Sequence, residues 1–264
     1  MPRLTRTVTT ASHRVVYEVE GRGEPTLLFI HGAASTREVW DEARPHFVDD
    51  HRVITLDLPG HGASSESSSY AASDFAEAVT AVMNDAAVER AVIVGHSFGV
   101  SVARDVALAM PERVAALQMV DGFLVPLGGG IPALVDPLLA SFASDDWEQA
   151  AEGFIDQFMI GANTPDDIAD RVRSMMLASE QATWLGTLTV ATSPEVESDE
   201  VIDVPVAGWF LPGVTLPASY EDYLRERFPQ LEMSVAEPGT GHFLMWERPD
   251  ELVTRVQALL DRAP

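Results

Sequence analysis

The chain of 264 residues contains no cysteine and no lysine, so all of its 17 basic residues are arginine. Without cysteine there is no disulfide, no thiolate nucleophile and no cysteine-based metal site, and any covalent chemistry must use oxygen or nitrogen. Long apolar runs are also absent, because TLLFI at 26–30 and AVIVG at 91–95 are far shorter than the roughly 20 residues that cross a bilayer. The N-terminus alternates like a strand and lacks an apolar signal segment. We therefore expect a cytoplasmic protein.

Positive charge is scarce in this chain. It carries 41 acidic residues, its net charge is -24, and the resulting field repels nucleic acid and anionic membranes. The same field disfavours polyanionic substrates, since no local basic patch is visible. We therefore expect no nucleic-acid or membrane partner, and a small-molecule substrate. At 46% hydrophobic residues, the chain is able to bury one large core with or without an insertion.

Short aliphatic runs alternate with segments of helical period, which is typical of an α/β architecture with a mostly parallel sheet. The pattern predicts eight strands, at 6–10, 14–19, 26–30, 52–57, 91–95, 114–120, 205–210 and 231–235. It predicts helices near 36–48, 72–86, 98–109, 218–228 and 249–261. Residues 123–200 contain no convincing strand, and three segments separated by Gly, Pro and Asn favour helices, at 128–142, 145–159 and 166–179. We expect a core formed by 1–122 and 201–264, with 123–200 as a helical cap, or lid.

The strongest motif is GHSFG at 95–99, a Gly-x-Ser-x-Gly sequence between an apolar strand and a helix. Such a tight turn holds the hydroxyl of Ser97 exposed at a helix N-terminus, where developing negative charge is stabilised. Serine is also a favoured N-cap, so Ser97 as a simple cap is the alternative. Because both glycines and both flanking elements are present, we expect Ser97 to be a nucleophile.

A serine nucleophile needs a base, and His242 has the most suitable context of the seven histidines. It follows the last predicted strand, in a loop that returns to the carboxyl edge of the sheet. His13, His46 and His51 lie in polar stretches and are expected at the surface. His96 belongs to the serine turn itself, which does not bring its own ring to the serine.

Four stretches together resemble the α/β-hydrolase family: HGAASTREVW at 31–40, DLPGHGAS at 57–64, GHSFG at 95–99 and GTGHFLMWERPDEL at 239–252. The resemblance covers nearly the whole chain outside the insertion. It implies an eight-stranded, mostly parallel sheet flanked by helices, a helical lid after the sixth strand, and no cofactor or metal. It also implies an oxyanion hole from the backbone N–H groups of Ala33 and Phe98. By the same resemblance, His31, Gly32, Asp57, Pro59, Gly60, His61 and Gly62 shape turns rather than perform chemistry.

The triad acid departs from the common family pattern. Family members usually carry it after the strand that follows the lid, but here that region reads VPVAGWFLPGVTLP and has Gly213 at the expected position. Haloalkane dehalogenases and certain lactone hydrolases instead place the acid after the sixth strand, which here ends in Asp121. We therefore expect Asp121 to be the acid. The alternatives are Glu221, Asp222 and a dyad without an acid.

Serine at the turn favours acyl transfer, because the dehalogenases and the related epoxide hydrolases attack with aspartate. The sequence predicts a serine esterase or lactonase that acts on a neutral, hydrophobic ester or lactone. We expect Gly32, Phe123, Met159, Trp184 and Phe243 to bind the substrate, although aromatic and Met residues at helical spacing more often form a lid core. The alternatives are a C–C bond hydrolase, a haloperoxidase-like enzyme, and a hydrolase-derived ligand-binding protein with little turnover.

Overall fold

The computed structural model describes residues 2–67, 69–122, 132–192, 200–212 and 218–263. One sheet contains all eight predicted strands, and their ends differ from the predicted ends by at most two residues. The strands are β1 Leu4–Thr9, β2 Arg14–Gly21, β3 Thr26–Ile30, β4 Arg52–Leu56, β5 Ala91–His96, β6 Val114–Val120, β7 Val206–Phe210 and β8 Leu231–Val235.

The strand order is β1-β2-β4-β3-β5-β6-β7-β8. β2 is antiparallel to both of its neighbours, and the pairs from β4 to β8 are parallel. Every residue of β3, β5 and β6 is buried, which explains why these strands are continuous apolar runs rather than alternating ones. Because the pairs from β4 to β8 are parallel, the carboxyl ends of these strands meet at one edge of the sheet, where ligands bind in open α/β folds.

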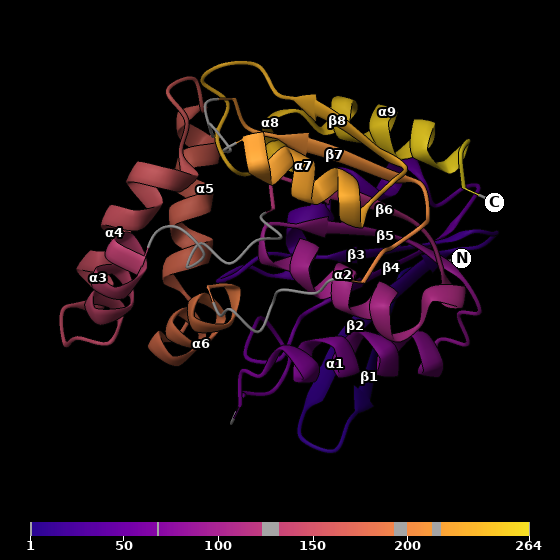
Figure 1. Cartoon of the computed structure of the whole chain (residues 1–264). Helices are drawn as coiled ribbons and strands as arrows, with labels where there is room; N and C mark the ends of the chain where they lie inside the picture. The colour runs from indigo at the N-terminus through magenta and orange to yellow at the C-terminus, as the bar shows by residue number, and fades with distance from the viewer. Residues whose placement is uncertain (1, 68, 123–131, 193–199, 213–217, 264) are drawn as a thin grey trace.

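Helices cover both faces of the sheet (Figure 1). One face packs against α1 Ala72–Asp85, α2 Phe98–Ala109 and α7 Ala218–Arg227, in a core built around Ile93, Val79 and Val106. The other face packs against the short α8 Leu244–Glu247 and against α9 Pro249–Leu260. Four of the predicted helices are therefore confirmed.

The predicted helix at 36–48 is wrong. The structure has two single 3₁₀ turns there, η1 Arg37–Trp40 and η2 Arg44–His46. Pro45 explains the interruption, since proline has no N–H to donate within a helix and instead occupies the first positions of η2. The apolar side chains of this segment, Val39 and Trp40 among them, are nevertheless buried, as the pattern indicated. A further 3₁₀ turn, η3 Pro111–Arg113, precedes β6.

Between β6 and β7 the chain forms a helical insertion, by which we mean residues 132–192 (Figure 1). It contains α3 Pro132–Phe142, α4 Trp147–Phe154, the π-helical turn η5 Ile155–Met159, α5 Asp166–Leu177 and α6 Gln181–Ala191. Its buried residues Phe142, Met176 and Trp184 belong to the same hydrophobic cluster as the α9 face of the sheet. The insertion therefore shares a core with the sheet.

Helix α6 was not predicted from the sequence. Thr183, Thr187 and Thr189 are β-branched, and Gly186 has a low helix propensity, so this segment lacks a clear helical signal. The Thr187 hydroxyl donates to the Thr183 carbonyl oxygen at 2.6 Å, and the Thr189 hydroxyl donates to that of Leu185 at 2.7 Å. These bonds satisfy Thr187 and Thr189 within the helix, whereas the Thr183 hydroxyl donates to the Gly60 carbonyl oxygen at 2.9 Å.

Over the described residues, no helix is long and apolar enough to cross a membrane.

Candidate active site

Ser97 occupies the turn between β5 and α2. Its backbone has φ 53° and ψ -121°, a conformation that is rare for a side-chain-bearing residue. The Ser97 N–H donates to the carbonyl oxygen of Val120 at 2.9 Å, which holds the turn against the end of β6. The half-buried Ser97 therefore sits in the strained strand-turn-helix geometry of a nucleophile elbow.

The two glycines of GHSFG are required by close backbone approach. A Cβ at Gly95 would lie 2.6 Å from the Gly99 carbonyl oxygen. A Cβ at Gly99 would lie 2.4 Å from the carbonyl oxygen of Ile30, at the end of β3. The motif thus allows α2 to begin directly against the sheet, at the carboxyl edge where Ser97 is presented.

His242 and Asp121 are hydrogen-bonded to each other, with 2.6 Å between His242 Nδ1 and Asp121 Oδ2. The other carboxylate oxygen, Oδ1, accepts a hydrogen bond from the Leu211 N–H at 3.0 Å. Asp121 itself has a left-handed backbone with φ 44°, and its N–H donates to the Trp209 carbonyl oxygen at 2.8 Å. An aspartate that accepts from Nδ1–H leaves the lone pair of the imidazole on Nε2, as a general base requires.

The main chain of His242 is also held on both sides. Its N–H donates to the Met159 carbonyl oxygen at 2.9 Å, and its carbonyl oxygen lies 3.0 Å from His96 Nε2. The His96 and His242 rings are 4.5 Å apart between centroids. Burial lowers the pKa of His96 well below its usual value, and the nearby His242 lowers it further. His96 is therefore neutral and donates from Nε2.

The two alternative acids lie elsewhere. Glu221 and Asp222 are exposed on α7, and Glu221 pairs with Arg225 at 2.7 Å in the next helical turn. Of the three candidate carboxylates, Asp121 is the one that is hydrogen-bonded to His242. Gly213, where the usual acid would stand, lies outside the described residues.

Phe98, one predicted oxyanion-hole residue, directly follows Ser97, and Ala33, the other, lies in the loop after β3. Phe98 is the first residue of α2, so its N–H has no carbonyl partner within that helix. The loop after β3 approaches Ser97 closely, because a Cβ at Gly32 would lie only 2.8 Å from Ser97 Cβ. Ala33 follows in this loop and is half-buried. Their role as oxyanion donors stays a prediction.

The remaining predicted substrate-binding residues have different surroundings. Phe123 lies outside the described residues. Trp184 is fully buried in the insertion, stacked on Phe142 at 5.0 Å between ring centroids. Phe243 is also buried, with its ring 5.1 Å from that of His96, and the carbonyl of Met159 contacts the His242 main chain. Their contact with substrate stays a prediction, and the packing of Trp184 is that of a core residue.

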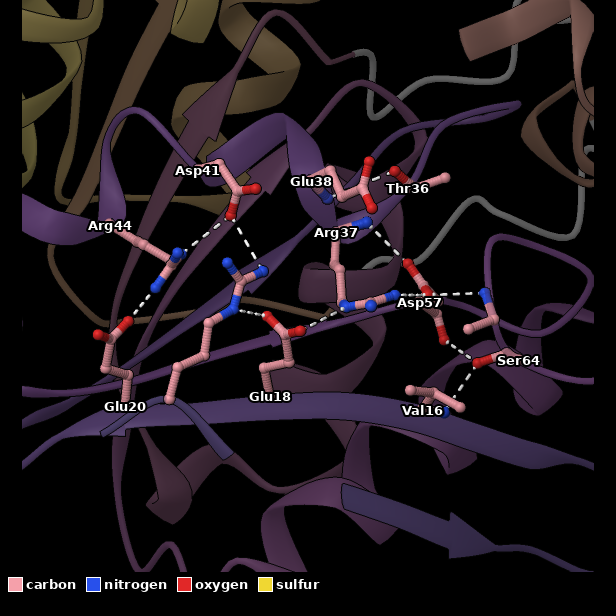
Figure 2. Close-up of polar contacts among 12 residues, drawn as sticks. Val16, Glu18, Glu20, Thr36, Arg37, Glu38, Asp41, Arg44, Asp57 and Ser64 are labelled. Atoms are coloured by element: carbon pink, nitrogen blue, oxygen red, sulfur yellow. Dashed lines mark hydrogen bonds and ion pairs between the residues drawn. The ribbon is translucent and has the colours of Figure 1, made fainter. Parts of the chain in front are cut away.

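Asp57, expected to shape a turn, is the centre of a buried polar network (Figure 2). Its carboxylate accepts hydrogen bonds from the N–H groups of Arg37 and Ala63, each at 2.8 Å, and it pairs with the Arg37 guanidinium. The Ser64 hydroxyl donates to the Asp57 carbonyl oxygen at 2.7 Å. This network fixes the loop after β4 against the loop after β3.

The network continues as a chain of alternating charges along β2 (Figure 2). Arg37 also contacts Glu18 at 3.3 Å, and Glu18 pairs with Arg3. Arg3 contacts Asp41 at 3.2 Å, Asp41 contacts Arg44 at 3.0 Å, and Arg44 pairs with Glu20. Sequence reasoning missed this feature, since most of its partners are distant in the chain and charge pairs have no local signature.

His31 and His61 are buried and serve the backbone. The Leu58 N–H donates to His31 Nε2 at 3.0 Å, and His31 Nδ1 lies 2.7 Å from the Gly32 carbonyl oxygen. Burial lowers the pKa of His31 to about 4 and that of His61 to about 3. His13, expected at the surface, is buried too, with Nε2 at 2.9 Å from the Ser67 hydroxyl, so that expectation was wrong.

Over the described ranges, no group of three or more His, Asp or Glu residues is arranged to hold a metal.

Comparison with known proteins links this geometry to one family. A sequence model described as the alpha/beta hydrolase family matches residues 27–255. A pimeloyl-[acyl-carrier protein] methyl ester esterase from Yersinia enterocolitica is 27% identical over 245 residues, which cover 87% of this chain and 90% of that protein. The dihydrolipoyllysine-residue acetyltransferase component of the acetoin cleaving system from Cupriavidus necator is 36% identical over 118 residues, 44% of this chain. The chain spans only 30% of the length of that relative.

Solved structures show the same architecture. The structure titled "Est816 as an N-Acyl homoserine lactone degrading enzyme" covers 96% of this chain with a TM-score of 0.82, and the match covers 99% of that chain. The two sequences are 22% identical, so this likeness shows the shared fold alone.

Proposed function

Because the chain belongs to the α/β-hydrolase family, we propose that it is a serine hydrolase that cleaves a neutral, hydrophobic carboxylic ester or lactone through an acyl-enzyme on Ser97. The observation that carries the proposal is the 2.6 Å hydrogen bond between His242 Nδ1 and Asp121. This pair stands at the sheet edge where the strained turn presents Ser97. Serine, histidine and aspartate are the three residue types that together activate a hydroxyl for acyl transfer.

Each proposed step uses a group of this chain. His242 Nε2 takes the proton of the Ser97 hydroxyl as Oγ attacks the carbonyl carbon, and Asp121 stabilises the imidazolium that forms. The N–H groups of Ala33 and Phe98 stabilise the tetrahedral oxyanion. When the C–O bond to the leaving group breaks, His242 returns the proton to the departing oxygen. A water molecule then gives a proton to His242, attacks the acyl-enzyme and releases the acid, and the proton returns to Ser97.

A neutral, apolar substrate is supported by charge and by the insertion. The net charge of -24 disfavours polyanionic substrates. The insertion is rich in apolar side chains, and its Met159 contributes a carbonyl contact to the His242 main chain. The names of the compared proteins, a methyl ester esterase and a lactone-degrading enzyme, agree with ester or lactone chemistry.

The first test is covalent labelling of Ser97 by a fluorophosphonate, followed by intact-mass spectrometry. We expect one adduct on the wild-type protein and on Ser73→Ala, a control at an exposed serine of α1, and none on Ser97→Ala. Turnover should fall roughly 10⁴-fold or more in Ser97→Ala. An adduct that persists in Ser97→Ala would contradict the proposed nucleophile.

The second test is a panel of p-nitrophenyl esters, lactones and vinylogous diketones. We expect turnover of esters or lactones, with the uncharged members preferred over those that carry a carboxylate. A clear preference for diketones would indicate a C–C bond hydrolase instead. Tight, saturable binding with negligible turnover of every compound would indicate a ligand-binding protein.

A further inference from the structure

The turn between η5 and α5 of the insertion lies directly against the loop that carries His242. We call residues 159–164 the insertion turn and residues 237–242 the histidine loop. The Asn163 N–H donates to the Gly239 carbonyl oxygen at 2.8 Å, and the Asn163 side-chain amide donates to the Pro238 carbonyl oxygen at 3.1 Å. The His242 N–H donates back to the Met159 carbonyl oxygen at 2.9 Å. The two segments are therefore joined at both ends.

Side chains extend this contact to the residue before His242. The Gly161 N–H donates to the Thr164 hydroxyl at 2.9 Å, and that hydroxyl donates to Glu247 Oε1 at 2.7 Å. The same Glu247 oxygen accepts the Gly241 N–H at 2.9 Å. Thr164 and Gly241 thus share one carboxylate oxygen, and Glu247 ends α8, the short helix that follows the histidine loop.

The two segments also leave no room for a side chain at two glycines. A Cβ at Gly161 would lie 2.3 Å from the Gly239 carbonyl oxygen and 2.6 Å from the Gly241 nitrogen. A Cβ at Gly241 would lie 2.6 Å from Glu247 Oε1 and 2.7 Å from Thr164 Oγ1. Even a methyl group at either position must therefore displace the insertion turn or the histidine loop.

We propose that the insertion turn acts as a clamp that sets the position of His242, with Thr164 and Gly161 as positioning residues. The inference rests on the proposed role of His242 as the general base. Asp121 fixes only the imidazole, whereas the place of the histidine main chain depends on Met159 on one side and His96 on the other. A base displaced by about 1 Å costs up to roughly 10²-fold in rate, because proton transfer needs hydrogen-bond geometry.

The steric test compares two glycine-to-alanine variants within the insertion. Gly161→Ala should lower kcat roughly 10-fold to 10²-fold with little change in KM, because it pushes the turn away from the histidine loop. Gly153→Ala is the matched control: Gly153 lies in α4, and a Cβ built there meets no atom within 4 Å. It should keep the wild-type kcat. NMR should show the downfield proton resonance of the His242–Asp121 hydrogen bond weakened in Gly161→Ala only.

The hydrogen-bond test compares two variants of one residue. Thr164→Val keeps the shape of the side chain but removes the hydroxyl that links Gly161 to Glu247, and we expect kcat to fall about 10-fold with KM retained. Thr164→Ser keeps the hydroxyl and should restore most of the wild-type kcat. Thermal unfolding of every variant separates loss of folded protein from loss of positioning.

The outcomes distinguish this inference from the function on which it rests. Wild-type kcat in both Gly161→Ala and Thr164→Val, beside an inactive Ser97→Ala, would overturn the clamp and leave the proposed function intact. A rise in KM without a fall in kcat would also overturn it, since the turn would then contact substrate rather than position the base. Full turnover in Ser97→Ala would overturn the proposed function and the clamp together.

Discussion

Asp57 and Asp121 invite comparison, because each follows directly the last residue of a strand in the same sheet and each is buried. Asp57, after β4, pairs with the guanidinium of Arg37 and accepts two backbone N–H groups. Asp121, after β6, accepts one backbone N–H group and bonds to the imidazole of His242. The same residue type at equivalent strand ends therefore faces a permanent cation in one place and a titratable ring in the other.

This difference separates a structural carboxylate from a candidate catalytic one. A guanidinium has no lone pair to accept a proton, so Asp57 and Arg37 hold two loops together but take no part in proton transfer. An imidazole gains and loses a proton near neutral pH, and a carboxylate beside it fixes its tautomer and stabilises its charged form. The partner, rather than the position on the sheet, indicates which aspartate serves chemistry.

The largest expected effect is that of Asp121→Asn on turnover. We expect kcat to fall by roughly 10² to 10⁴, because an amide at this place no longer holds the imidazole in the reactive tautomer or stabilises the imidazolium. Steady-state kinetics on the best ester of the panel measures this loss. The free energy of unfolding should change little, since the Leu211 N–H keeps an acceptor.

The control for Asp121→Asn is fluorophosphonate labelling of the folded variant. Slow but complete labelling of Ser97 would show that the nucleophile is in place and that the base alone is impaired. Wild-type kcat in Asp121→Asn would contradict the assignment of Asp121 as the acid and remove the contrast with Asp57.

The next largest effect is expected for Asp57→Asn, and it concerns stability instead of turnover. Removing the carboxylate leaves the largely buried Arg37 with only Glu18 as an ion-pair partner among the residues that the structure describes. We expect the free energy of unfolding to fall by about 3 kcal/mol, the lower end of the range for breaking a buried pair. Urea unfolding measures this change, and turnover per folded molecule should stay within about twofold of wild type. A large fall in kcat at normal stability would refute the structural role.

The sequence indicated the candidate site residues but not the side chains that surround them. Ser97 was indicated by the GHSFG motif, His242 by its place in the loop after the last strand, and Asp121 by the resemblance to relatives with the acid after the sixth strand. The predicted contact between His242 and Asp121 is present in the structure, and the catalytic roles of the three residues stay predictions. The charge chain around Arg37 and the contact between Thr164 and Glu247 were not found. Both depend on side chains brought together by tertiary folding, for which no periodicity exists in the sequence.

In the fold, too, the elements with a clear local signal in the sequence were predicted and those without one were not. All eight strands were predicted: central strands such as TLLFI and AVIVG are short continuous apolar runs, and the outer strands β1 and β2 are rich in β-branched residues. The helix predicted at 36–48 failed because Pro45 interrupts it, and α6 was missed because its threonines and Gly186 weaken the helical signal. Proline therefore decided the outcome in the first segment, whereas α6 is helical despite its weak local propensity for helix.

Per pH unit, a smaller change in stability is expected from pH, through the histidines near Asp57. Burial lowers the pKa of His31 to about 4 and that of His61 to about 3, whereas an unfolded histidine titrates at about 6.5. Below pH 6.5, each of these histidines is protonated in the unfolded chain but stays neutral in the folded chain. As the pH falls from 6.5 to about 4, the free energy of unfolding should therefore decrease by about 1.4 kcal/mol per pH unit for each histidine. Above pH 6.5 this contribution to stability is fully present.

His61→Gln tests this directly, with urea unfolding at several pH values from about 4.5 to about 6.5. The slope of the unfolding free energy against pH should be smaller than in wild type by about 1.4 kcal/mol per unit. His46, exposed in η2, offers a matched control, and His46→Gln should leave the slope as it is. An unchanged slope in His61→Gln would mean that His61 is able to bind a proton in the folded protein.

The smallest effect is expected for Glu221→Gln and Asp222→Asn. These variants test whether a carboxylate other than Asp57 or Asp121 acts as the acid. Both carboxylates lie on the exposed face of α7, and Glu221 pairs with Arg225 one turn along the helix. An exposed pair of this kind stabilises a protein by about 0.5 kcal/mol or less, and neither residue contacts His242 among the described residues. Both variants should therefore keep the wild-type turnover and unfold within about 0.5 kcal/mol of wild type. If either variant instead lost turnover by roughly 10²-fold, and Asp121→Asn stayed active, the role of acid would pass to α7 and Asp121 would be a strand-end residue like Asp57.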